Sequence, residues 1–370
     1  MNTLIKILII LVVILIALGV IMVFTASGTY SVTRFNNLYL LFRQHFGKVI
    51  IAVIAMYIFS KIPYDKYRDY SKWALLTMIF VLIFTFIFAP RVKGASRWIN
   101  LGFIQFQPSE AAKVLLIIHI AFMLEKMGDE LKDFRKGFIF PILWIGVISF
   151  LVFIQPNVST SLIIAITSFS LLFVAGAKMK HLFGIIAPSV FVVSIAVMLF
   201  KHSRDRVISF IEYLINGGRL NDQVTQAKIA LGSGGLFGVG LGHSRQSDLF
   251  LPESYGDFIF SILGEETGFI GVLAILIVYL ILFVTCLVIA KKAQDKFGQL
   301  LVLGLAFNII VSVFINAAVV TGLIPTTGIT LPFISFGGTS IILFAVSIGI
   351  IVNVGRQTVK TTELKIAQVG

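Results

Sequence analysis

Long apolar runs recur along nearly the whole chain, and they are the feature that most limits how it can fold. Hydrophobic residues make up 58% of the 370 residues, and only 13% are charged. A membrane-crossing helix needs about 20 consecutive apolar residues, and one soluble core cannot bury this much apolar surface. The chain is therefore predicted to be an all-α polytopic membrane protein. A soluble enzyme, a coiled coil and a disordered chain are excluded.

Ten such runs divide the chain into about ten predicted transmembrane helices. They cover approximately residues 4–24, 44–60, 73–89, 108–124, 138–154, 159–175, 182–200, 264–289, 298–320 and 339–354. The first run exceeds the 7–15 apolar residues of a typical cleaved signal peptide, so we expect an uncleaved anchor. Residues 1–370 are predicted to form a single integral membrane domain. Its one large extramembrane loop is predicted at residues 201–263, between helices seven and eight.

The basic charge of the chain has a topological explanation. The formal net charge is +13, from 30 Lys and Arg against 17 Asp and Glu. If the N-terminus lies in the cytoplasm, more than half of the Lys and Arg residues fall in segments on that side. Cytoplasmic loops of membrane proteins carry this excess. We therefore expect both termini in the cytoplasm and no nucleic-acid partner.

The predicted outer loop contains two further patterns. Apolar residues recur at helical spacing over residues 204–216, while Arg206, Glu212 and Asn216 fall outside that face. Such an amphipathic helix lies on the membrane or packs on the protein's own loops, and the pattern leaves both open. The glycine-rich stretch 232–242 lacks the strand and the Gly-Lys-Ser/Thr ending of a nucleotide site. It is predicted to be a tight irregular loop, with contact to a lipid-linked pyrophosphate left open.

An acidic residue stands at the edge of the eighth span. Asp257, Ser261 and Glu265 are spaced four residues apart, which would place them on one face of a helix. A helix running from there through the span would be too long for one crossing, so we expect a break at Gly264 or Gly268. A carboxylate at the membrane edge is costly unless it has a partner or a function. The spacing leaves helix capping and catalysis equally open.

The fourth span begins with polar residues inside an apolar context. It starts at Pro108, and Glu110 and Lys113 share one helix face. An intramembrane lysine indicates a function, although an ion pair that only fixes the helix is the alternative. Upstream, Arg97 and Trp98 combine a cation with an interfacial aromatic ring, as simple membrane anchors also do.

The connection between spans nine and ten is both irregular and apolar. Two prolines and four glycines in residues 321–338 forbid a regular helix. Irregular backbone at membrane depth occurs where protein buries it or where it lines a cavity. We therefore predict an outer re-entrant loop. On span nine, Asn308, Ser312 and Asn316 form a polar stripe that is predicted to make interhelical hydrogen bonds.

In this order, these segments resemble the SEDS family of membrane proteins, which includes RodA, FtsW and SpoVE. The matching segments are residues 94–99, 107–113, 232–242, 251–268 and 316–338. Phe336 stands where the family usually has Tyr, and Gly256 where Thr is common. The resemblance implies a peptidoglycan glycosyltransferase that polymerises lipid II on the outer face of the bacterial cytoplasmic membrane. Thr330 before Leu331 is closer to the FtsW and SpoVE pattern, which implies a role at the division septum rather than in elongation.

The resemblance also implies roles for individual residues. Asp257 would be the catalytic general base. Substrate-binding roles would fall to Arg97, Glu110, Lys113, Glu253 and Ser261. The departing polyprenyl pyrophosphate needs positive charge, from basic side chains or from a divalent cation such as Mg²⁺ or Mn²⁺. No nucleotide or organic cofactor is expected. The implied partners are the growing glycan strand, a class B penicillin-binding protein with transpeptidase activity, and membrane lipids.

Two other functions suit the same architecture. A lipid II flippase or other transporter would keep its ionisable groups near the midplane of the membrane, whereas no Asp or Glu lies deep in any predicted span. A noncatalytic scaffold for a class B penicillin-binding protein would keep its role after loss of Asp257.

Overall fold

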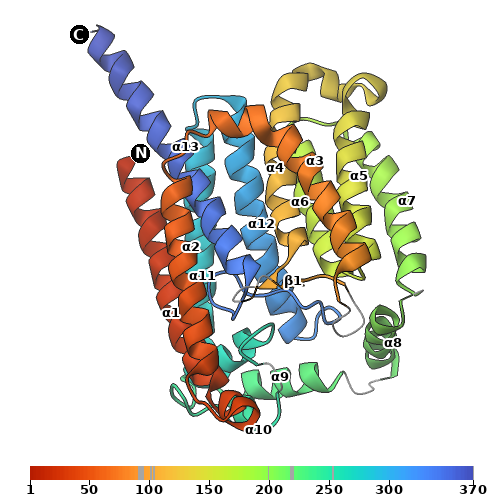
Figure 1. Cartoon of the computed structure of the whole chain (residues 1–370), viewed down its shortest axis with the longest axis vertical. Coiled ribbons are helices and arrows are strands. Elements are labelled where there is room, and N and C mark those ends of the chain that lie inside the picture. The colour runs from red at the N-terminus through yellow and green to blue at the C-terminus, as the bar shows by residue number, and fades with distance from the viewer. Residues whose placement is uncertain are drawn as a thin grey trace.

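The apolar runs fold into long helices that pack side by side, as Figure 1 shows. The computed structural model describes residues 1–90, 96–100, 102, 105–198, 200–216, 221–251 and 254–369. Within these ranges, the side chains of residues 196, 201–203, 248, 249 and 360–369 are not described.

The bundle consists of helices that match the predicted spans in order. They are α1 (Asn2–Phe35), α2 (Leu40–Phe59), α3 (Asp65–Phe88), α4 (Pro108–Met127), α5 (Ile139–Ile154), α6 (Val158–Val174), α7 (Met179–Val197), α11 (Ile259–Lys291), α12 (Lys296–Val320) and α13 (Thr339–Val369). Among the described residues, seven helices are long and apolar enough to cross a membrane. The polytopic helical architecture is thus confirmed. The count of ten crossings stays a prediction for α4 and for the shorter apolar helices α6 and α7.

The remaining elements are short. They are β1 (Ile99–Asn100), β2 (Gln105–Phe106), the 3₁₀-helix η1 (Gly128–Lys132), the π-helix η2 (Phe134–Phe138), α8 (Lys201–Asn216), α9 (Asp222–Ser233) and α10 (Arg245–Leu249). Helices α8, α9 and α10 lie at the end of the bundle away from both chain termini (Figure 1). We call this end the loop end. The N-terminus and the C-terminus both lie at the other end of the bundle, as an even number of membrane crossings requires.

Two segments far apart in sequence are joined where α4 begins. Strands β1 and β2 form an antiparallel hairpin in which Ile99 pairs with Phe106. The Gln107 amide donates to Thr339 Oγ1 at 2.8 Å, and that hydroxyl donates to the Gln105 carbonyl at 3.1 Å. The hairpin is therefore fixed to the first residues of both α4 and α13.

Helix α11 is broken at Gly268, one of the two predicted positions. Gly268 adopts φ 69° and ψ −173°, which only glycine adopts readily. The Val239 and Gly240 amides of the glycine-rich loop donate to the Glu265 and Glu266 carbonyls at 2.9 and 3.1 Å. The irregular loop predicted at residues 232–242 is confirmed for residues 234–242, while Gly232 and Ser233 form the end of α9. Its amides satisfy carbonyls at the break, as buried backbone requires.

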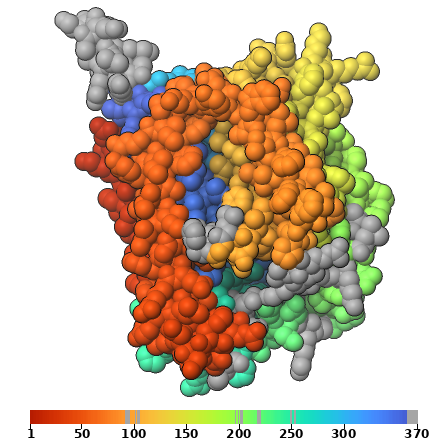
Figure 2. Space-filling view, in the orientation of Figure 1, coloured from red at the N-terminus to blue at the C-terminus, as the bar shows by residue number. Residues whose placement is uncertain are grey.

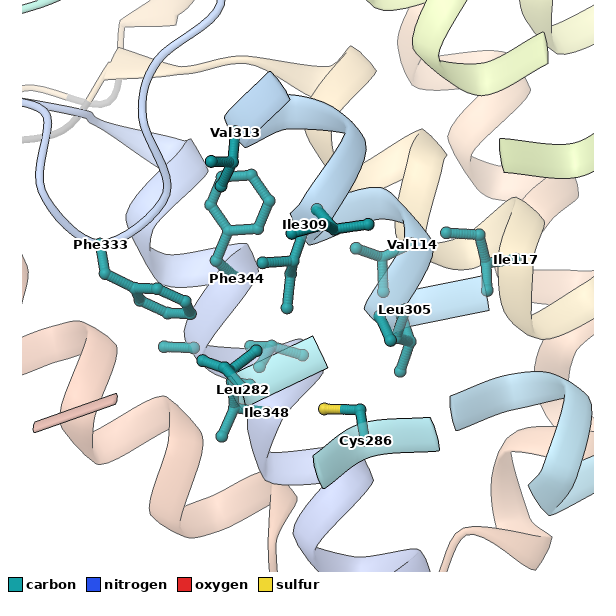
Figure 3. Close-up of a cluster of buried hydrophobic side chains, with 14 of the residues drawn as sticks. Val114, Ile117, Leu282, Cys286, Leu305, Ile309, Val313, Phe333, Phe344 and Ile348 are labelled. Atoms are coloured by element: carbon teal, nitrogen blue, oxygen red, sulfur yellow. The ribbon is translucent and has the colours of Figure 1, made fainter. Parts of the chain in front are cut away.

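The segment predicted as a re-entrant loop is irregular and packs among the helices, as expected, while its course relative to the membrane stays a prediction. Residues 321–338 form no helix and reach the middle of α1, where a methyl group on Gly19 would collide with the Phe333 carbonyl. Phe333 is buried, and its ring centre lies 5.9 Å from that of Phe344 in α13. Figure 3 shows both rings in the apolar core, which α4, α11, α12 and α13 share. The Tyr279 hydroxyl of α11 donates to the Pro332 carbonyl.

The end with the termini is held differently, by side-chain ion pairs. Arg68 of α3 lies 3.1 Å from Glu125 of α4 and 2.7 Å from Asp295, the residue that precedes α12. Asp295 also accepts from the Gly298 amide at 2.7 Å and so caps α12. One arginine thereby joins three helices at this end.

Several helices extend beyond the predicted apolar runs. Helix α11 begins at Ile259, inside the segment 201–263 predicted as the extramembrane loop, because a helix that bonds internally can extend past the apolar run. For the same reason α1, with 34 residues, and α13, with 31, are longer than the predicted spans. The amphipathic helix predicted at residues 204–216 is confirmed as α8.

Candidate active site

Asp257 lies in a turn at the loop end, two residues before α11 begins at Ile259. Its side chain is half-buried, and its Oδ2 atom faces the re-entrant loop. A methyl group added to Gly328 of that loop would lie 3.3 Å from Oδ2. Gly328 has φ 75°, so a side chain there would be strained as well as close. The re-entrant loop therefore forms a wall directly beside the carboxylate.

A buried amide ties the turn to this wall. Asn316 Nδ2 of α12 donates to the Asp257 and Ile329 carbonyls, each at 2.7 Å. Asn316 thus bonds to a turn and to an irregular loop rather than to another helix, so the interhelical bond predicted for the polar stripe is wrong for this residue. The same prediction is wrong for Ser312, whose hydroxyl donates to the Asn308 carbonyl within α12 at 2.8 Å.

An aromatic contact joins the same two segments. The Phe336 amide donates to the Tyr255 carbonyl at 2.9 Å, and the two rings meet edge to face at 5.3 Å. The Lys48 ammonium of α2 lies 4.1 Å from the centre of the Phe336 ring, a cation–π contact. The phenylalanine at this position therefore supports the turn through its ring.

Arg206 of α8 is a site residue that sequence reasoning missed. Its Nη1 donates to the Thr326 carbonyl of the re-entrant loop at 3.2 Å. Thr326 is two residues from Gly328, which borders Asp257. Burial lowers the pKa of the Arg206 guanidinium, and the Asp257 carboxylate acts in the opposite direction. The available signal was the position of Arg206 outside the apolar face of the amphipathic helix.

Arg97 lies near Arg206 but has other partners. Its Nε donates to the Gln155 carbonyl at 3.1 Å, and its Nη2 donates to the Pro156 carbonyl. Burial, together with the neighbouring Arg206 charge, lowers the pKa of Arg97 to about 10, so it stays protonated at neutral pH. Arg97 therefore fastens the residues before β1 to the connection between α5 and α6.

Glu110 and Lys113 form the predicted ion pair. Lys113 Nζ lies 3.0 Å from Glu110 Oε2, and the two side chains are 4% and 10% exposed for Lys113 and Glu110, respectively. The ammonium also lies 5.8 Å from the centre of the Phe344 ring. The two charges neutralise each other inside the bundle.

Ser261 does not share a helix face with Asp257. Because α11 begins at Ile259, Asp257 precedes the helix, and the predicted common face is wrong. The Ser261 side chain is fully buried, and its hydroxyl donates to the Phe258 carbonyl at 2.7 Å. Glu253, the other predicted contact in this region, lies outside the described residues.

Glu265, the third residue of that predicted face, has a structural partner. It is buried and accepts from the Ser244 hydroxyl at 2.5 Å and from the Arg245 amide at 3.2 Å. The carboxylate therefore binds the first turn of α10, where the helix dipole favours an anion. Next to it, Glu266 accepts from the Thr25 hydroxyl of α1 at 3.1 Å.

The molecular surface is hollowed beside these elements. Figure 2 shows a hollow in which α13 is visible between α2 and α4. Helix α2 carries Lys48, α4 carries the Glu110 and Lys113 pair, and Phe336 lies three residues before the start of α13. The helices that border the hollow are therefore those that carry several candidate residues.

A resident divalent cation is not supported by the side chains around Asp257. Among the described residues, no group of three or more His, Cys, Asp and Glu could hold a metal ion. The Arg206 guanidinium is one charged neighbour of the Asp257 carboxylate. The part of the chain that the structure describes therefore shows no side-chain cluster for Mg²⁺ or Mn²⁺ by itself, so the expected metal stays a prediction and no step is assigned to it.

Comparison with known sequences gives consistent matches over nearly the whole chain. The family model for FtsW, RodA and SpoVE, described as "Cell cycle protein", matches residues 5–360. A probable peptidoglycan glycosyltransferase FtsW of Geobacter sp. (strain M18) is 36% identical over 93% of this chain and 95% of its own length. The stage V sporulation protein E of Bacillus subtilis (strain 168) is 36% identical over 94% of this chain and 96% of its own length.

Solved structures share the fold. One, from a study of how a peptidoglycan synthase complex coordinates polymerization and crosslinking, matches with a TM-score of 0.74 and 22% identity over 95% of this chain and 97% of the other. The rod shape determining protein RodA of Thermus thermophilus matches with a TM-score of 0.71 and 23% identity over 95% of this chain and 96% of the other.

Proposed function

Because the chain belongs to the family of FtsW, RodA and SpoVE, we propose that it polymerises lipid II into glycan strands, with Asp257 as the general base. The chain is a multi-pass membrane protein and a peptidoglycan glycosyltransferase of cell-wall synthesis. The observation that carries the proposal is the half-buried Asp257 carboxylate, held at the loop end beside Gly328.

The proposed reaction needs one base and stabilisation of one anion. The acceptor's 4-hydroxyl oxygen attacks the anomeric carbon of the donor sugar, and its proton passes to the Asp257 carboxylate. The bond between that carbon and the pyrophosphate oxygen breaks, and polyprenyl pyrophosphate leaves with the electron pair. Direct displacement inverts the anomeric centre. Because the leaving group is already a stable anion, a second carboxylic acid is not required.

Asp257 suits the role of base better than Glu110, the other acidic residue singled out from the sequence. Glu110 is buried and bound to the Lys113 ammonium at 3.0 Å. Asp257 is half-buried and lies in irregular backbone at the loop end, where a sugar hydroxyl can approach it. A general base must come within hydrogen-bond reach of the proton it accepts.

The residues proposed to bind substrate differ in how strongly their contacts support that role. Glu253 stays a candidate by its position in the sequence, close to Asp257. Arg97 and Ser261 bond to backbone carbonyls, which favours a supporting role for both side chains. Glu110 and Lys113 are proposed to support the substrate site from α4, which borders the hollow shown in Figure 2, while their charges stay paired with each other.

We also propose where and with which partner the protein acts. Its loop end would face outward, because the positive-inside pattern puts both termini in the cytoplasm. A class B penicillin-binding protein is the proposed partner, supported by the fold match to a synthase complex for polymerization and crosslinking. Sequence relatives named FtsW and stage V sporulation protein E favour a division role. A tagged copy at midcell would agree with that role, and a lateral-wall signal would contradict it.

The experiment that tests the reaction supplies purified protein with lipid II, with and without the transpeptidase partner. We expect glycan polymer on a gel and one polyprenyl pyrophosphate released per glycosidic bond. A flippase would instead move lipid II across a liposome bilayer without polymer. A scaffold would do neither, so the absence of polymer with the partner present would contradict the proposal.

A further inference from the structure

The proposed reaction releases a pyrophosphate, whose negative charge needs a basic side chain beside it. The basic side chains described near the site differ in how far they are already engaged by protein groups. Two guanidinium nitrogens of Arg97 are bonded to the Gln155 and Pro156 carbonyls. Lys113 is nearly fully buried and is paired with Glu110. Both side chains are therefore engaged in holding the bundle together.

Arg206 differs because it contacts the loop that borders the carboxylate. Its Nη1 donates to the Thr326 carbonyl, and Oδ2 of Asp257 lies beside Gly328 of the same loop. We propose that Arg206 binds the pyrophosphate of the lipid-linked donor and stabilises the charge that develops as it leaves. This inference rests on the proposed function and names the cation for its leaving group.

The chemistry of the side chain fits this ligand. The bond to Thr326 uses one of the five N–H donors of the guanidinium, and a planar fork of donors matches phosphate oxygens in pairs. Preorganised donors act most strongly where charge develops in the transition state. The 3.2 Å bond holds Arg206 on the wall beside the proposed base, so one side chain can serve the bond that breaks while Asp257 serves the hydroxyl that attacks.

The position of α8 explains how the cation would meet a lipid headgroup. Four large apolar side chains elsewhere on this helix are exposed, by 40% to 75%: Ile208, Ile211, Leu214 and Ile215. A helix with such a face lies in the membrane interface, at the boundary of headgroups and acyl chains. The pyrophosphate of a membrane-anchored lipid lies at this same depth. Arg206 would then be placed at the level of its ligand.

Helix α8 is also anchored on the protein side. Lys228 of α9 donates to the Tyr213 hydroxyl at 3.1 Å, and its ammonium lies 5.2 Å from the centre of the Tyr213 ring. Tyr213 lies seven residues after Arg206, two helical turns along the same face. This contact and the bond to Thr326 hold the face that carries Arg206 against the loop end.

The test compares Arg206→Gln, Arg206→Lys and the control Arg204→Gln for binding of farnesyl pyrophosphate and farnesyl monophosphate in detergent. Arg204 is on the same helix, but it is 45% exposed and lies 3.7 Å from Asp205. Loss of a charge-assisted contact should weaken pyrophosphate binding by about tenfold in Arg206→Gln. Monophosphate binding should change less, Arg206→Lys should be intermediate, and Arg204→Gln should match the wild type. The KM for lipid II should rise most in Arg206→Gln, less in Arg206→Lys and not at all in Arg204→Gln.

A wild-type ratio of pyrophosphate to monophosphate affinity in a folded Arg206→Gln variant would overturn the inference. So would an equal loss in Arg204→Gln, because it would indicate general surface charge. If Arg206→Gln does not fold, a wild-type ratio and KM in Arg206→Lys would overturn it, since lysine does not reproduce the guanidinium fork. Binding that depends on Arg206 in a wild-type protein that makes no polymer would support the inference and contradict the proposed polymerisation.

Discussion

Two acidic residues of this protein illustrate two ways of placing a charge in a membrane bundle. Glu110 lies in the first turn of the regular helix α4, where Lys113, on the same face, neutralises it at 3.0 Å. Asp257 lies outside regular helix, in a turn held by the Asn316 amide and walled by the re-entrant loop. The Glu110 carboxylate is buried in the bundle and neutralised by a residue of its own helix. The Asp257 carboxylate lies half-exposed in a segment of irregular backbone.

The difference shows what the irregular segments contribute. A helix satisfies its own backbone and leaves the placement of side chains to helical spacing. At the loop end, backbone groups that lie outside regular helix form hydrogen bonds with one another or with the ends of helices. The Val239 and Gly240 amides, for example, donate to carbonyls at the break in α11. Such a framework can hold a carboxylate half-exposed beside a cation, where a substrate can reach it. We therefore place the chemistry at Asp257 and the packing role at Glu110.

The largest expected effect is on activity, when the Asp257 carboxylate is removed. Asp257→Asn should lower lipid II polymerisation by about 10²- to 10⁴-fold, the usual contribution of a general base. The thermal unfolding midpoint should stay close to that of the wild type. Asp205→Asn on α8 is the control, because its carboxylate is 58% exposed, and it should retain activity. Equal activity in Asp257→Asn and Asp205→Asn would contradict the role of Asp257 as the general base.

Breaking the helical pair should have the largest effect on stability. Lys113→Met leaves Glu110 unpaired inside the bundle and should lower the free energy of unfolding by about 3–5 kcal/mol. Adding Glu110→Gln should restore much of that loss. Lys132→Met is the matched control, because Lys132 and Asp129 form an exposed pair with the same spacing, worth about 0–1 kcal/mol. Denaturant unfolding in detergent measures all of these variants, and similar losses in Lys113→Met and Lys132→Met would contradict a packing role.

A substitution at the helix break tests the irregular framework. A methyl group on Gly268 would collide with the Gly238 amide, and its φ of 69° disfavours any side chain. Gly268→Ala should therefore destabilise the protein by about 2–3 kcal/mol through backbone strain. Gly146→Ala in α5, where a methyl group meets nothing within 4 Å, should be neutral or slightly stabilising. Equal unfolding midpoints for the two variants would show that the break is not needed.

The smallest expected effect comes from removing the Asn316 amide that supports the turn at Asp257. Asn316→Ala leaves the Asp257 and Ile329 carbonyls without their amide donor and should cost about 1–2 kcal/mol. Because the turn loses its support, polymerisation should fall in kcat more than in KM. The control Ser312→Ala removes a hydroxyl that bonds within its own helix and should change kcat little. A larger loss of kcat in Ser312→Ala would contradict the role of Asn316.

The sequence predicts the features that local chemistry decides. The break at Gly268, the amphipathic helix and the re-entrant loop all follow from glycine, proline and apolar spacing within short segments. The pair of Glu110 and Lys113 follows from helical spacing.

Contacts between distant segments could not be predicted in this way. Arg206 meets a carbonyl 120 residues further along the chain, and Asn316 meets one 59 residues before it. Periodicity shows that Arg206 leaves the apolar face but not which loop it reaches. The turn at Asp257 was missed for a related reason, because tertiary contacts hold this residue outside the helix to which spacing alone would assign it.

The central claim is that the Asp257 carboxylate accepts the proton of the attacking hydroxyl, and the pH dependence of polymerisation tests it most directly. The kcat/KM of the wild type should fall as the pH is lowered, because a protonated carboxylate cannot act as a base. In Asp257→Asn the residual rate should be flat over the same acidic range, and Asp257→Glu should recover part of both the rate and its pH dependence. An unchanged acidic decline in Asp257→Asn, or polymerisation at the wild-type rate, would contradict the account.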